Sequence, residues 1–407
     1  MDVRIVPKTL RGSVTPPGSK SMTHRLLIAA ALGGGVSTVE NVSFSEDIEA
    51  TLRCLTALGG RWERAGGSSL RVAGCGARPF GVLPRFDCGE SGSTLRFFLP
   101  IALAVCGGGI FSGGGRLLER PLGPYLALFD ERGIFHEQRG GVLTVRGSLT
   151  PGEYRLPGDV SSQFFTGLLF ALPLLPGPSR IVSTTEIESR DYILMTADAL
   201  ASAGANPAEL LENPGFFAVS PFAYRPFIRT VEADWSQAAF WYAANFLDCG
   251  VKLDGLNPNS IQGDRIVSDL YWKLARPGNT VMDVSSCPDL LPPLAVMAAF
   301  RAGETRFTGG ARLRLKESDR LTSVAAMLSA LGGEVQELPD GLAVRGKPRL
   351  AGGTVDGASD HRVVMAAAVA AAACDAPVTI LGAEAVSKSY PGFFDDYKRL
   401  GGEVHVL

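Results

Sequence analysis

A helical stretch that ends in glycine and is followed by a short paired segment recurs along the whole chain, and this repeat limits the possible folds more than any other feature. The steps between the terminating glycines are roughly 70 residues, with one shorter step of about 54, and such a regular period indicates a repeat architecture. The six copies end at Leu58-Gly59-Gly60, Arg132-Gly133, Ala203-Gly204, Pro277-Gly278, Leu331-Gly332-Gly333 and Leu400-Gly401-Gly402.

The first copy shows why these residues form a unit. An apolar stripe at helical spacing runs through residues 48–58, and Gly59 or Gly60 supplies the left-handed position that ends a helix. Residues 61–72 then alternate around a glycine turn, which predicts a hairpin. We expect the same helix-plus-hairpin unit in each of the six copies.

Six such units divide evenly into two similar α/β domains of three repeats each. A chain of 407 residues is too long for one ordinary core, which favours the same division. The strand within residues 3–14 has no partner before the first unit, so we assign it to the far domain. The predicted domains are residues 1–18 with 231–407, and residues 19–230, and we expect a ligand site in the cleft between them.

Composition excludes several classes of protein. The net charge of −2 argues against a general nucleic-acid binder, and apolar stretches are interrupted before the roughly 18 residues that a membrane span needs. The beginning of the chain, Met1 to Arg4, lacks the pattern of a signal peptide. We therefore expect a cytoplasmic protein that binds neither nucleic acid nor membrane. The sequence does not give the oligomeric state, for which we take a monomer as the expectation.

Cysteine and histidine are not arranged as ligands. The seven cysteines are odd in number and show no C-x-x-C spacing, and the four histidines are scattered. The sequence therefore predicts neither a disulfide framework nor a metal site.

Basic residues gather where loops enter helices. In the stretch from Pro17 to Arg25, a glycine and three hydroxyls precede a long apolar run, and Ser19, Ser21 or Thr23 can cap the helix. The ordinary interpretation of each such place is a capped helix with solvated charges. Repeated in both halves of a near-neutral chain, the pattern predicts a site for a small polyanion, because helix N-termini and cations both attract anions. The residues are Lys20, Arg25, Arg96, Arg120, Lys316, Arg320, Arg362 and Lys388.

Nine short motifs stand in order over the full length of the chain. They are P-G-S-K-S-x-x-x-R at Pro17–Arg25, G-x-x-G-[ST]-x-x-R at Gly89–Arg96, E-R-P at Glu119–Pro121, V-S-S-Q-F at Val160–Phe164, N-S-x-Q-G-D at Asn259–Asp264, P-D at Pro288–Asp289, K-E-[ST]-D-R at Lys316–Arg320, D-H-R at Asp360–Arg362 and K-[ST]-[FY]-P at Lys388–Pro391. No one motif is decisive, but the whole set is specific, and it resembles the motifs of the 5-enolpyruvylshikimate-3-phosphate synthase family (3-phosphoshikimate 1-carboxyvinyltransferase).

The resemblance implies the enolpyruvyl transferase fold, an inside-out α/β barrel of two three-repeat domains. It implies transfer of the enolpyruvyl group of phosphoenolpyruvate to the 5-hydroxyl of shikimate 3-phosphate, with release of phosphate through a tetrahedral intermediate. This step belongs to the shikimate pathway to chorismate and aromatic amino acids, and the family is the target of the inhibitor glyphosate. The implied partners are these two small molecules, with no cofactor and no metal.

Site residues follow from the resemblance, position by position. Asp289 would be the base near the acceptor hydroxyl, Lys20 and Glu317 the proton carriers, with the choice between them open, and His361 would lie close by. Shikimate 3-phosphate would be bound by Lys20, Ser21, Arg25, Ser161, Ser162, Gln163, Ser189, Tyr192, Asp289 and Lys316. Phosphoenolpyruvate would be bound by Lys20, Gly92, Ser93, Arg120, Gln163, Arg320, Arg362 and Lys388.

Three residues depart from the family pattern. Glu90 and Arg312 stand where the family often has Asn, and Phe97 stands where Pro is common. A carboxylate at Glu90 would repel phosphoenolpyruvate unless it pairs with a cation or points away. Glyphosate sensitivity is therefore open, although the retained Gly92 leaves room for such an inhibitor.

Two alternative functions remain to be weighed. The related UDP-N-acetylglucosamine enolpyruvyl transferase shares fold and chemistry, but it has Asn where this chain has Ser21, and a cysteine in the loop where this chain has Gly115. A non-catalytic binding protein on the same scaffold would not need the full set of apparent catalytic residues.

Overall fold

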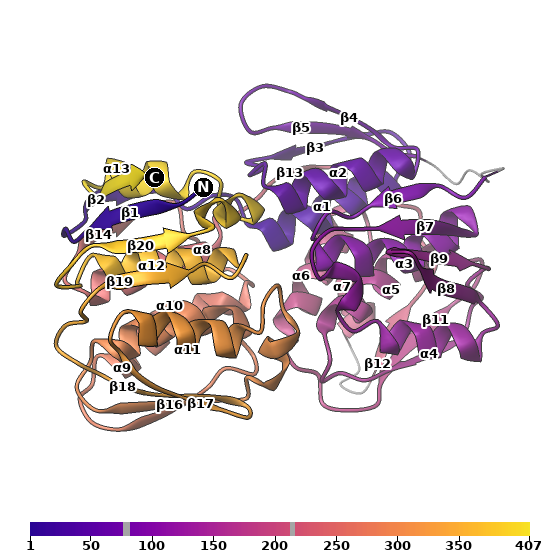
Figure 1. Cartoon of the computed structure of the whole chain (residues 1–407). Helices are drawn as coiled ribbons and strands as arrows, with labels where there is room; N and C mark the ends of the chain where they lie inside the picture. Colours follow the sequence, from indigo (N-terminus) through magenta and orange to yellow (C-terminus); the bar gives the residue numbers. More distant parts are fainter. Residues whose placement is uncertain (76–81, 212–215) are drawn as a thin grey trace. The chain divides into compact units, whose positions relative to one another are not determined.

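The chain forms two compact units, each built from three small sheets and a set of helices (Figure 1). The computed structural model describes residues 1–75, 82–211 and 216–407. One unit, here called the discontinuous unit, consists of Met1–Pro17 and Glu232–Leu407, and the other, the continuous unit, of Gly18–Val231. Gly18 and Val231 thus belong to the continuous unit, one residue away from the boundaries expected from the sequence.

The continuous unit contains three sheets with the strand orders β13-β3-β5-β4, β6-β7-β9-β8 and β10-β11-β12. Its strands are β3 (Val36–Glu40), β4 (Arg61–Arg64), β5 (Leu70–Ala73), β6 (Arg85–Asp87), β7 (Gly108–Ser112), β8 (Phe135–Arg139), β9 (Val142–Arg146), β10 (Glu153–Leu156), β11 (Ser179–Ser183), β12 (Phe216–Val219) and β13 (Ile228–Thr230). Its helices are α1 (Lys20–Leu32), α2 (Glu46–Ala57), α3 (Gly92–Cys106), η1 (Leu117–Glu119), α4 (Gly123–Glu131), α5 (Ser162–Ala171), η2 (Leu172–Leu174), α6 (Asp191–Ser202) and α7 (Pro207–Leu211).

The discontinuous unit contains three sheets with the strand orders β19-β20-β1-β21, β15-β16-β18-β17 and β14-β2. Its strands are β1 (Val3–Val6), β2 (Arg11–Val14), β14 (Gly250–Leu253), β15 (Thr280–Asp283), β16 (Glu304–Thr308), β17 (Glu334–Leu338), β18 (Gly341–Arg345), β19 (Gly353–Asp356), β20 (Val378–Leu381) and β21 (Glu403–Val406). Its helices are α8 (Trp235–Phe246), η3 (Gly263–Ile266), α9 (Val267–Leu274), η4 (Pro288–Leu290), α10 (Leu291–Ala299), η5 (Ala311–Leu315), α11 (Arg320–Ala330), α12 (His361–Ala371), η6 (Ala383–Lys388) and α13 (Phe393–Arg399).

Each sheet includes one parallel pair, and in four of the six pairs a buried helix lies between the two strands in sequence. The pairs are β6 with β7, β10 with β11, β15 with β16, β19 with β20, β13 with β3 and β14 with β2. The helices α1, α3 and α5 of one unit and α8, α10 and α12 of the other are buried nearly all round. An apolar helix with no polar face requires this position, because every side of it must be covered.

All six predicted helix-ending glycines adopt the expected conformation. The φ angles are 98° at Gly59, 65° at Gly133, 103° at Gly204, 97° at Gly278, 84° at Gly332 and 92° at Gly401. Positive φ costs glycine little, and a residue with a Cβ would be strained there.

The prediction of a hairpin after every glycine is wrong for three of the six copies. Hairpins follow the first, second and fifth glycines, as β4 with β5, β8 with β9 and β17 with β18. After Gly204 the chain forms α7 and then β12, which pairs with β11. After Gly278, β15 begins a parallel pair, and after Gly401, β21 pairs with β1 near the start of the chain, Val3 opposite Val406. Long-range pairing replaces the local hairpin in these copies.

The chain crosses between the units twice, and the strands next to each crossing pair within their own unit. In sequence β2 leads to α1 and β3, yet β2 pairs with β14 in the discontinuous unit, while β13 pairs with β3 in the continuous unit. Val231 is bonded to the continuous unit, since its N–H donates to Glu40 and its carbonyl accepts from Asn41 Nδ2 at 2.8 Å. A Cβ at Gly18 would lie 1.9 Å from the Asn41 carbonyl oxygen. The glycine therefore serves this close backbone contact.

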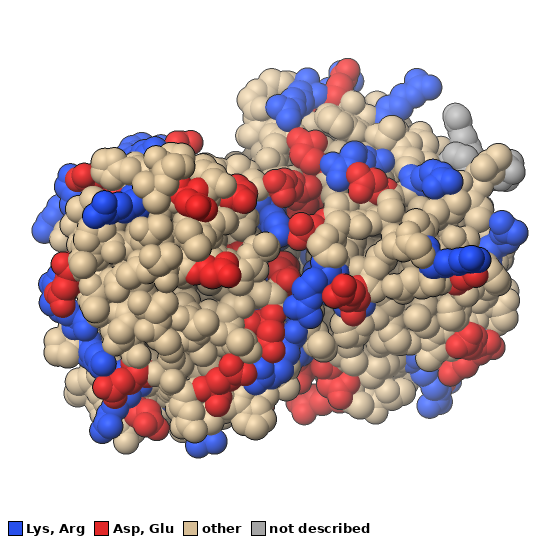
Figure 2. Space-filling view, viewed as in Figure 1, with Lys and Arg blue, Asp and Glu red and all other residues tan. Residues whose placement is uncertain are grey.

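The surface carries both charge signs. Figure 2 shows Lys and Arg interspersed with Asp and Glu over the visible face, in line with totals of 39 and 41. In the part of the chain that the structure describes, the helices lack the combination of length and hydropathy that crossing a bilayer requires.

Candidate active site

In the continuous unit, side chains from the N-terminal halves of three buried helices are linked. Arg25 on α1 contacts α5 through Thr166, Gln163 on α5 contacts α3 through Ser93, and α1 also contacts α6. Each helix has a hydroxyl N-cap: Ser19 accepts from the Met22 N–H, Ser91 from Thr94 and Ser161 from Gln163. The positive ends of these helix dipoles and their remaining N–H groups therefore gather in one region, which suits an anion.

Lys20 is the first residue of α1, and its ammonium lies 2.6 Å from Asp47 Oδ2 on α2. Both side chains are mostly buried, with 16% and 13% of their surfaces exposed. A partly desolvated charge pair of this kind holds the ammonium in a defined position. Sequence reasoning missed Asp47, because an acidic residue in the first turn of a helix is ordinary and α2 has three of them.

Arg25 is a buried cation surrounded by neutral acceptors. Its guanidinium donates to the carbonyls of Ser21 and Tyr192, at 2.7 and 3.0 Å, and to Thr196 Oγ1 at 2.9 Å. Phe97 and Tyr192 place their rings 5.3 and 5.8 Å from its Cζ. Burial lowers the pKa of Arg25 to about 10. These contacts fix the charge where an anionic ligand would stabilise it.

Gly92, the first residue of α3, lies against the Arg120 guanidinium. A Cβ at Gly92 would stand 2.7 Å from both Cζ and Nη1 of Arg120. The neighbouring Ser93 Oγ accepts from Gln163 Nε2 at 2.9 Å, and Gln163 Oε1 accepts from Arg96 at 2.7 Å. The structure thus brings the predicted residues of this group together and adds Arg96, whose role the motif did not specify.

The remaining predicted residues of this unit lie at the starts of α5 and α6. Ser161 caps α5 and Ser162 begins it, and Ser162 is 5% exposed. Ser189 adopts a φ of 54°, which is uncommon for a residue other than glycine, and Tyr192 lies one turn later beside Arg25. Helix α6 packs against both α1 and α5, and its first turn contacts Arg25 through the Tyr192 carbonyl.

In the discontinuous unit, Arg320 is held by three carboxylates from three elements. Its Nε lies 2.9 Å from Asp360, its Nη1 2.8 Å from Asp289 and its Nη2 2.5 Å from Glu317. Arg320 and Asp360 are fully buried. Burial opposes the charge of Arg320, but the three carboxylates outweigh it and raise its pKa. Asp360, which sequence reasoning treated only as part of a motif, is therefore a structural anion of this group.

Asp289 accepts from three cations. Besides Arg320, it lies 3.4 Å from Lys316 Nζ and 3.1 Å from Arg362 Nη2. Arg362 also donates to Ser236 Oγ on α8 at 2.7 Å. Burial lowers the pKa of Lys316 to about 8, even though Asp289 opposes this shift. The arrangement interleaves cations with carboxylates, so both anion binding and proton transfer are chemically available.

The N-termini of four helices surround this group. Asp234 caps α8, Asp319 caps α11 and Asp360 caps α12, while Asp289 lies in η4, two residues before α10 begins. Buried Asp264 lies near Arg362. Burial and the charge of Asp289 raise the pKa of Asp264 to about 7, and sequence reasoning did not place it in the site.

His361 and Lys388 complete the predicted set in this unit. His361 is the first residue of α12 and is buried. Lys388 ends η6, is 7% exposed, and donates to the Ser359 carbonyl at 2.9 Å.

The three departures from the family pattern have distinct surroundings. Glu90 extends along the glycine-rich loop, since a Cβ at Gly115 would lie 2.8 Å from its carboxylate, and the Glu90 side chain is exposed. Phe97 is buried and faces Arg25. Arg312 donates to the Ser285 carbonyl, in the loop before Asp289. Glu90 therefore packs on backbone, and Arg312 supports a loop.

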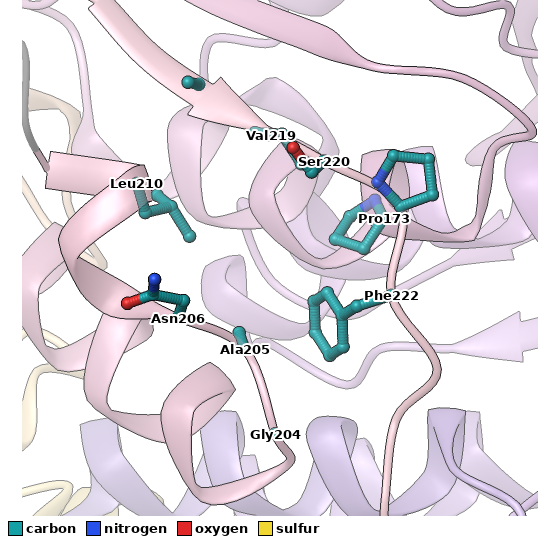
Figure 3. A pocket seen from close by; sticks show the side chains of 10 residues that line it. Pro173, Gly204, Ala205, Asn206, Leu210, Val219, Ser220 and Phe222 are labelled. Carbon is teal, nitrogen blue, oxygen red and sulfur yellow. The ribbon is translucent and has the colours of Figure 1, made fainter.

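A cavity of about 200 Å³ lies elsewhere in the continuous unit (Figure 3). It is lined by uncharged residues that share no member with the groups above: Pro173, Gly204, Ala205, Asn206, Leu210, Ala218, Val219, Ser220, Pro221 and Phe222. Anion chemistry has no support there. The described residues also contain no group of three or more His, Cys, Asp or Glu side chains suited to a metal ion.

The repeated α/β fold and two groups of cations with carboxylates define an enzyme of small anionic substrates. The sequence model for EPSP synthase (3-phosphoshikimate 1-carboxyvinyltransferase) matches residues 6–397. The chain belongs to this family, and the resemblance found in its motifs is confirmed.

Relatives support the same assignment over the full length. The chain is 43% identical to the 3-phosphoshikimate 1-carboxyvinyltransferase of Clostridium kluyveri and 41% identical to that of Clostridium acetobutylicum, and each match covers 99% of this chain and 98% of the relative. Among solved structures, EPSP synthase from Acinetobacter baumannii matches with a TM-score of 0.79 at 23% identity, covering 100% of both chains. The last comparison shows the fold alone, and it confirms the predicted enolpyruvyl transferase fold.

Proposed function

We propose that this chain transfers the enolpyruvyl group of phosphoenolpyruvate to the 5-hydroxyl of shikimate 3-phosphate and releases phosphate. The observation that carries the proposal is the interleaved set of cations and carboxylates around Asp289 and Arg320, in a chain that belongs to the EPSP synthase family. The reaction serves the shikimate pathway, and we propose that the enzyme acts in the cytoplasm as a monomer.

Phosphoenolpyruvate would be bound by cations from both groups. Arg120 beside Gly92 and Ser93 would bind one end, and Arg320, Arg362 and Lys388 the other. Arg320 already contacts Asp289 and Glu317, so the substrate would have to replace at least one of these contacts. This exchange would leave a carboxylate beside the substrate, ready to accept or give a proton.

Shikimate 3-phosphate would be bound mainly by the group around Arg25. The hydroxyls of Ser21, Ser161, Ser162 and Ser189 and the Tyr192 side chain supply donors, and Lys20 and Lys316 supply charge. Gln163, which contacts both Ser93 and Arg96, would lie next to both substrates.

The chemistry needs one base and one acid. Asp289 would take the proton of the acceptor hydroxyl while the hydroxyl oxygen bonds to C2 of phosphoenolpyruvate. Lys20 or Glu317 would protonate the methylene carbon. In the second step that methyl group returns a proton, the C–O bond to phosphate breaks, and the enolpyruvyl double bond forms again. His361 would act beside these groups. The two groups of residues would thus serve one reaction.

The test is phosphate release from phosphoenolpyruvate with shikimate 3-phosphate as acceptor, alongside UDP-N-acetylglucosamine as a competing acceptor. We expect release with the first acceptor only, and a loss of at least about 100-fold in kcat for Asp289→Asn, because the base is removed. Release with the second acceptor only would assign the chain to the other enolpyruvyl transfer reaction. Absence of release with both would refute the proposal.

A further inference from the structure

Four buried polar side chains connect three helices of the continuous unit. His24 Nδ1 on α1 lies 2.7 Å from Thr51 Oγ1 on α2, which lies 2.8 Å from Thr94 Oγ1 on α3. Thr94 Oγ1 in turn lies 2.8 Å from Ser91 Oγ, the N-cap of α3. Each of the four is at most 1% exposed. A polar chain this deep must be satisfied internally.

The direction of the hydrogen bonds fixes the state of the imidazole. The Thr94 hydroxyl donates to Ser91, so it must accept from Thr51. Thr51 has then used its one proton and must accept from His24, whose Nδ1 therefore carries the hydrogen. The other nitrogen, Nε2, is left with a lone pair, and it is indeed buried with no hydrogen-bond partner in the structure.

The surroundings keep this imidazole uncharged. Burial lowers the pKa of His24 far below its usual range, and the nearby charges of Lys20 and Arg25 lower it further. The ring also contacts Phe97 edge-on, with centroids 6.4 Å apart. A charged imidazole would need a second acceptor at Nε2, and the structure provides none there.

The hydrogen-bonded series from His24 to Ser91 links the helices that carry the two parts of the site in this unit. Helix α1 bears Lys20 and Arg25, and α2 bears Asp47, the partner of Lys20, one turn before Thr51. Helix α3 begins with Gly92 against Arg120, directly after the Ser91 cap. A shift of any helix along its axis would break a link of the chain.

We propose that His24 is a positioning residue, whose neutral Nδ1–H imidazole holds α1, α2 and α3 in register so that the groups expected to bind the two substrates keep their spacing. The inference rests on the proposed function, because the effect of register is measured in enolpyruvyl transfer. His24 itself touches neither substrate in this scheme. Its loss should therefore lower kcat more than it raises either KM.

The kinetic test uses variants that break or restore single links. We expect His24→Leu and Thr51→Val to lower kcat by about 10- to 100-fold with KM values within about threefold, because a misplacement near 1 Å has effects of this size. His24→Asn, whose amide can donate where Nδ1–H does, should recover most of the loss. A variant that combines His24→Leu with Thr51→Val should have a kcat no lower than the slower single variant, since both substitutions break the same hydrogen-bonded series. Thr56→Val removes an exposed hydroxyl from the same helix and should leave kcat unchanged.

The spectroscopic test does not depend on activity. Nitrogen-15 NMR of the full-length protein should show His24 protonated at Nδ1 and free of titration between pH 5.5 and 8.5, roughly the range in which ordinary histidines titrate. A signal for Nε2–H, or titration near pH 6.5, the unperturbed value, would overturn the inference. So would variants that lose thermal stability but keep kcat, or an Asn variant as slow as the Leu variant. An inactive wild-type enzyme would instead refute the proposed function. The NMR result would then still decide the protonation state of the His24 imidazole.

Discussion

Replacing Gly92 with alanine tests how closely α3 supports Arg120. The added Cβ would stand 2.7 Å from Cζ and Nη1 and 2.8 Å from Nη2 of the guanidinium. Carbon atoms in packed interiors stay at about 3.4 Å or more, so the guanidinium must move by about 0.7 Å or further. The backbone itself should not suffer, because Gly92 lies at the start of a helix and alanine favours helices.

The displacement sets the expected size of the effect. A cation moved by nearly 1 Å from its productive position can cost about 100-fold in rate, which is about 2.7 kcal/mol of transition-state binding. The loss should fall on phosphoenolpyruvate, because Arg120 is expected to bind that substrate. Affinity for shikimate 3-phosphate should stay within about twofold, since Arg25 is held by its own contacts with Ser21, Thr196 and Tyr192.

Steady-state phosphate release, with each substrate varied in turn, measures this difference, and calorimetry with shikimate 3-phosphate measures its binding alone. Gly123→Ala is the matched control, because Gly123 also begins a helix and a Cβ there meets nothing within 4 Å. We expect the control to behave as wild type. If Gly92→Ala keeps kcat/KM for phosphoenolpyruvate within twofold, the assignment of Arg120 to that substrate is wrong.

Three further predictions concern the charged groups. The pKa of Lys316 is lowered to about 8, so this lysine loses its proton as pH rises through that value. KM for shikimate 3-phosphate should therefore rise above pH 8 in wild type but not in Lys316→Arg. Equal pH profiles of KM for the two enzymes would exclude Lys316 as the group that titrates. Arg320→Met should lower the free energy of unfolding by about 3–5 kcal/mol in urea titrations at pH 7, because Asp289, Glu317 and Asp360 lose their shared cation; a loss below about 1 kcal/mol would contradict this. Asp47→Asn should lower kcat by about 10-fold in single-turnover measurements, since it removes the charge that orients the Lys20 ammonium, and an unchanged rate would show that the pair has no catalytic role.

The architecture was readable from sequence because its signals are local. A glycine after an apolar helical stripe predicts the left-handed residue that ends the helix, and all six such glycines have positive φ. The partner of a following strand is not a local property. Residues 280–283 and 403–406 carry the same kind of short pattern as a hairpin strand, yet the first pair with β16 across a helix and the second with β1 near the start of the chain. Hairpins were therefore predicted in places where long-range pairing occurs.

The charged residues also divide into those that local sequence predicts and those that only the folded structure reveals. Cations at helix starts could be found from sequence, since a motif places Lys20 or Arg320 at a defined position. Their partners could not, because Asp47 is one of three acids in an ordinary first turn and Asp264 lies in a motif without an assigned role. The buried chain from His24 to Ser91 joins three helices, and only the folded packing reveals it.

The pairing of β1 with two strands far along the sequence of the discontinuous unit has a consequence for the order in which the protein can fold during synthesis. The continuous unit is complete once Val231 has been made, so it can fold while the ribosome still holds the rest. Strand β1 must wait, because both of its partners, β20 and β21, are made long after it. Until then, the apolar side chains of Val3 and Ile5 have no sheet to enter. The nascent chain thus carries an unpaired strand until β20 and β21 have been made, and chaperones that bind short apolar segments would find it there.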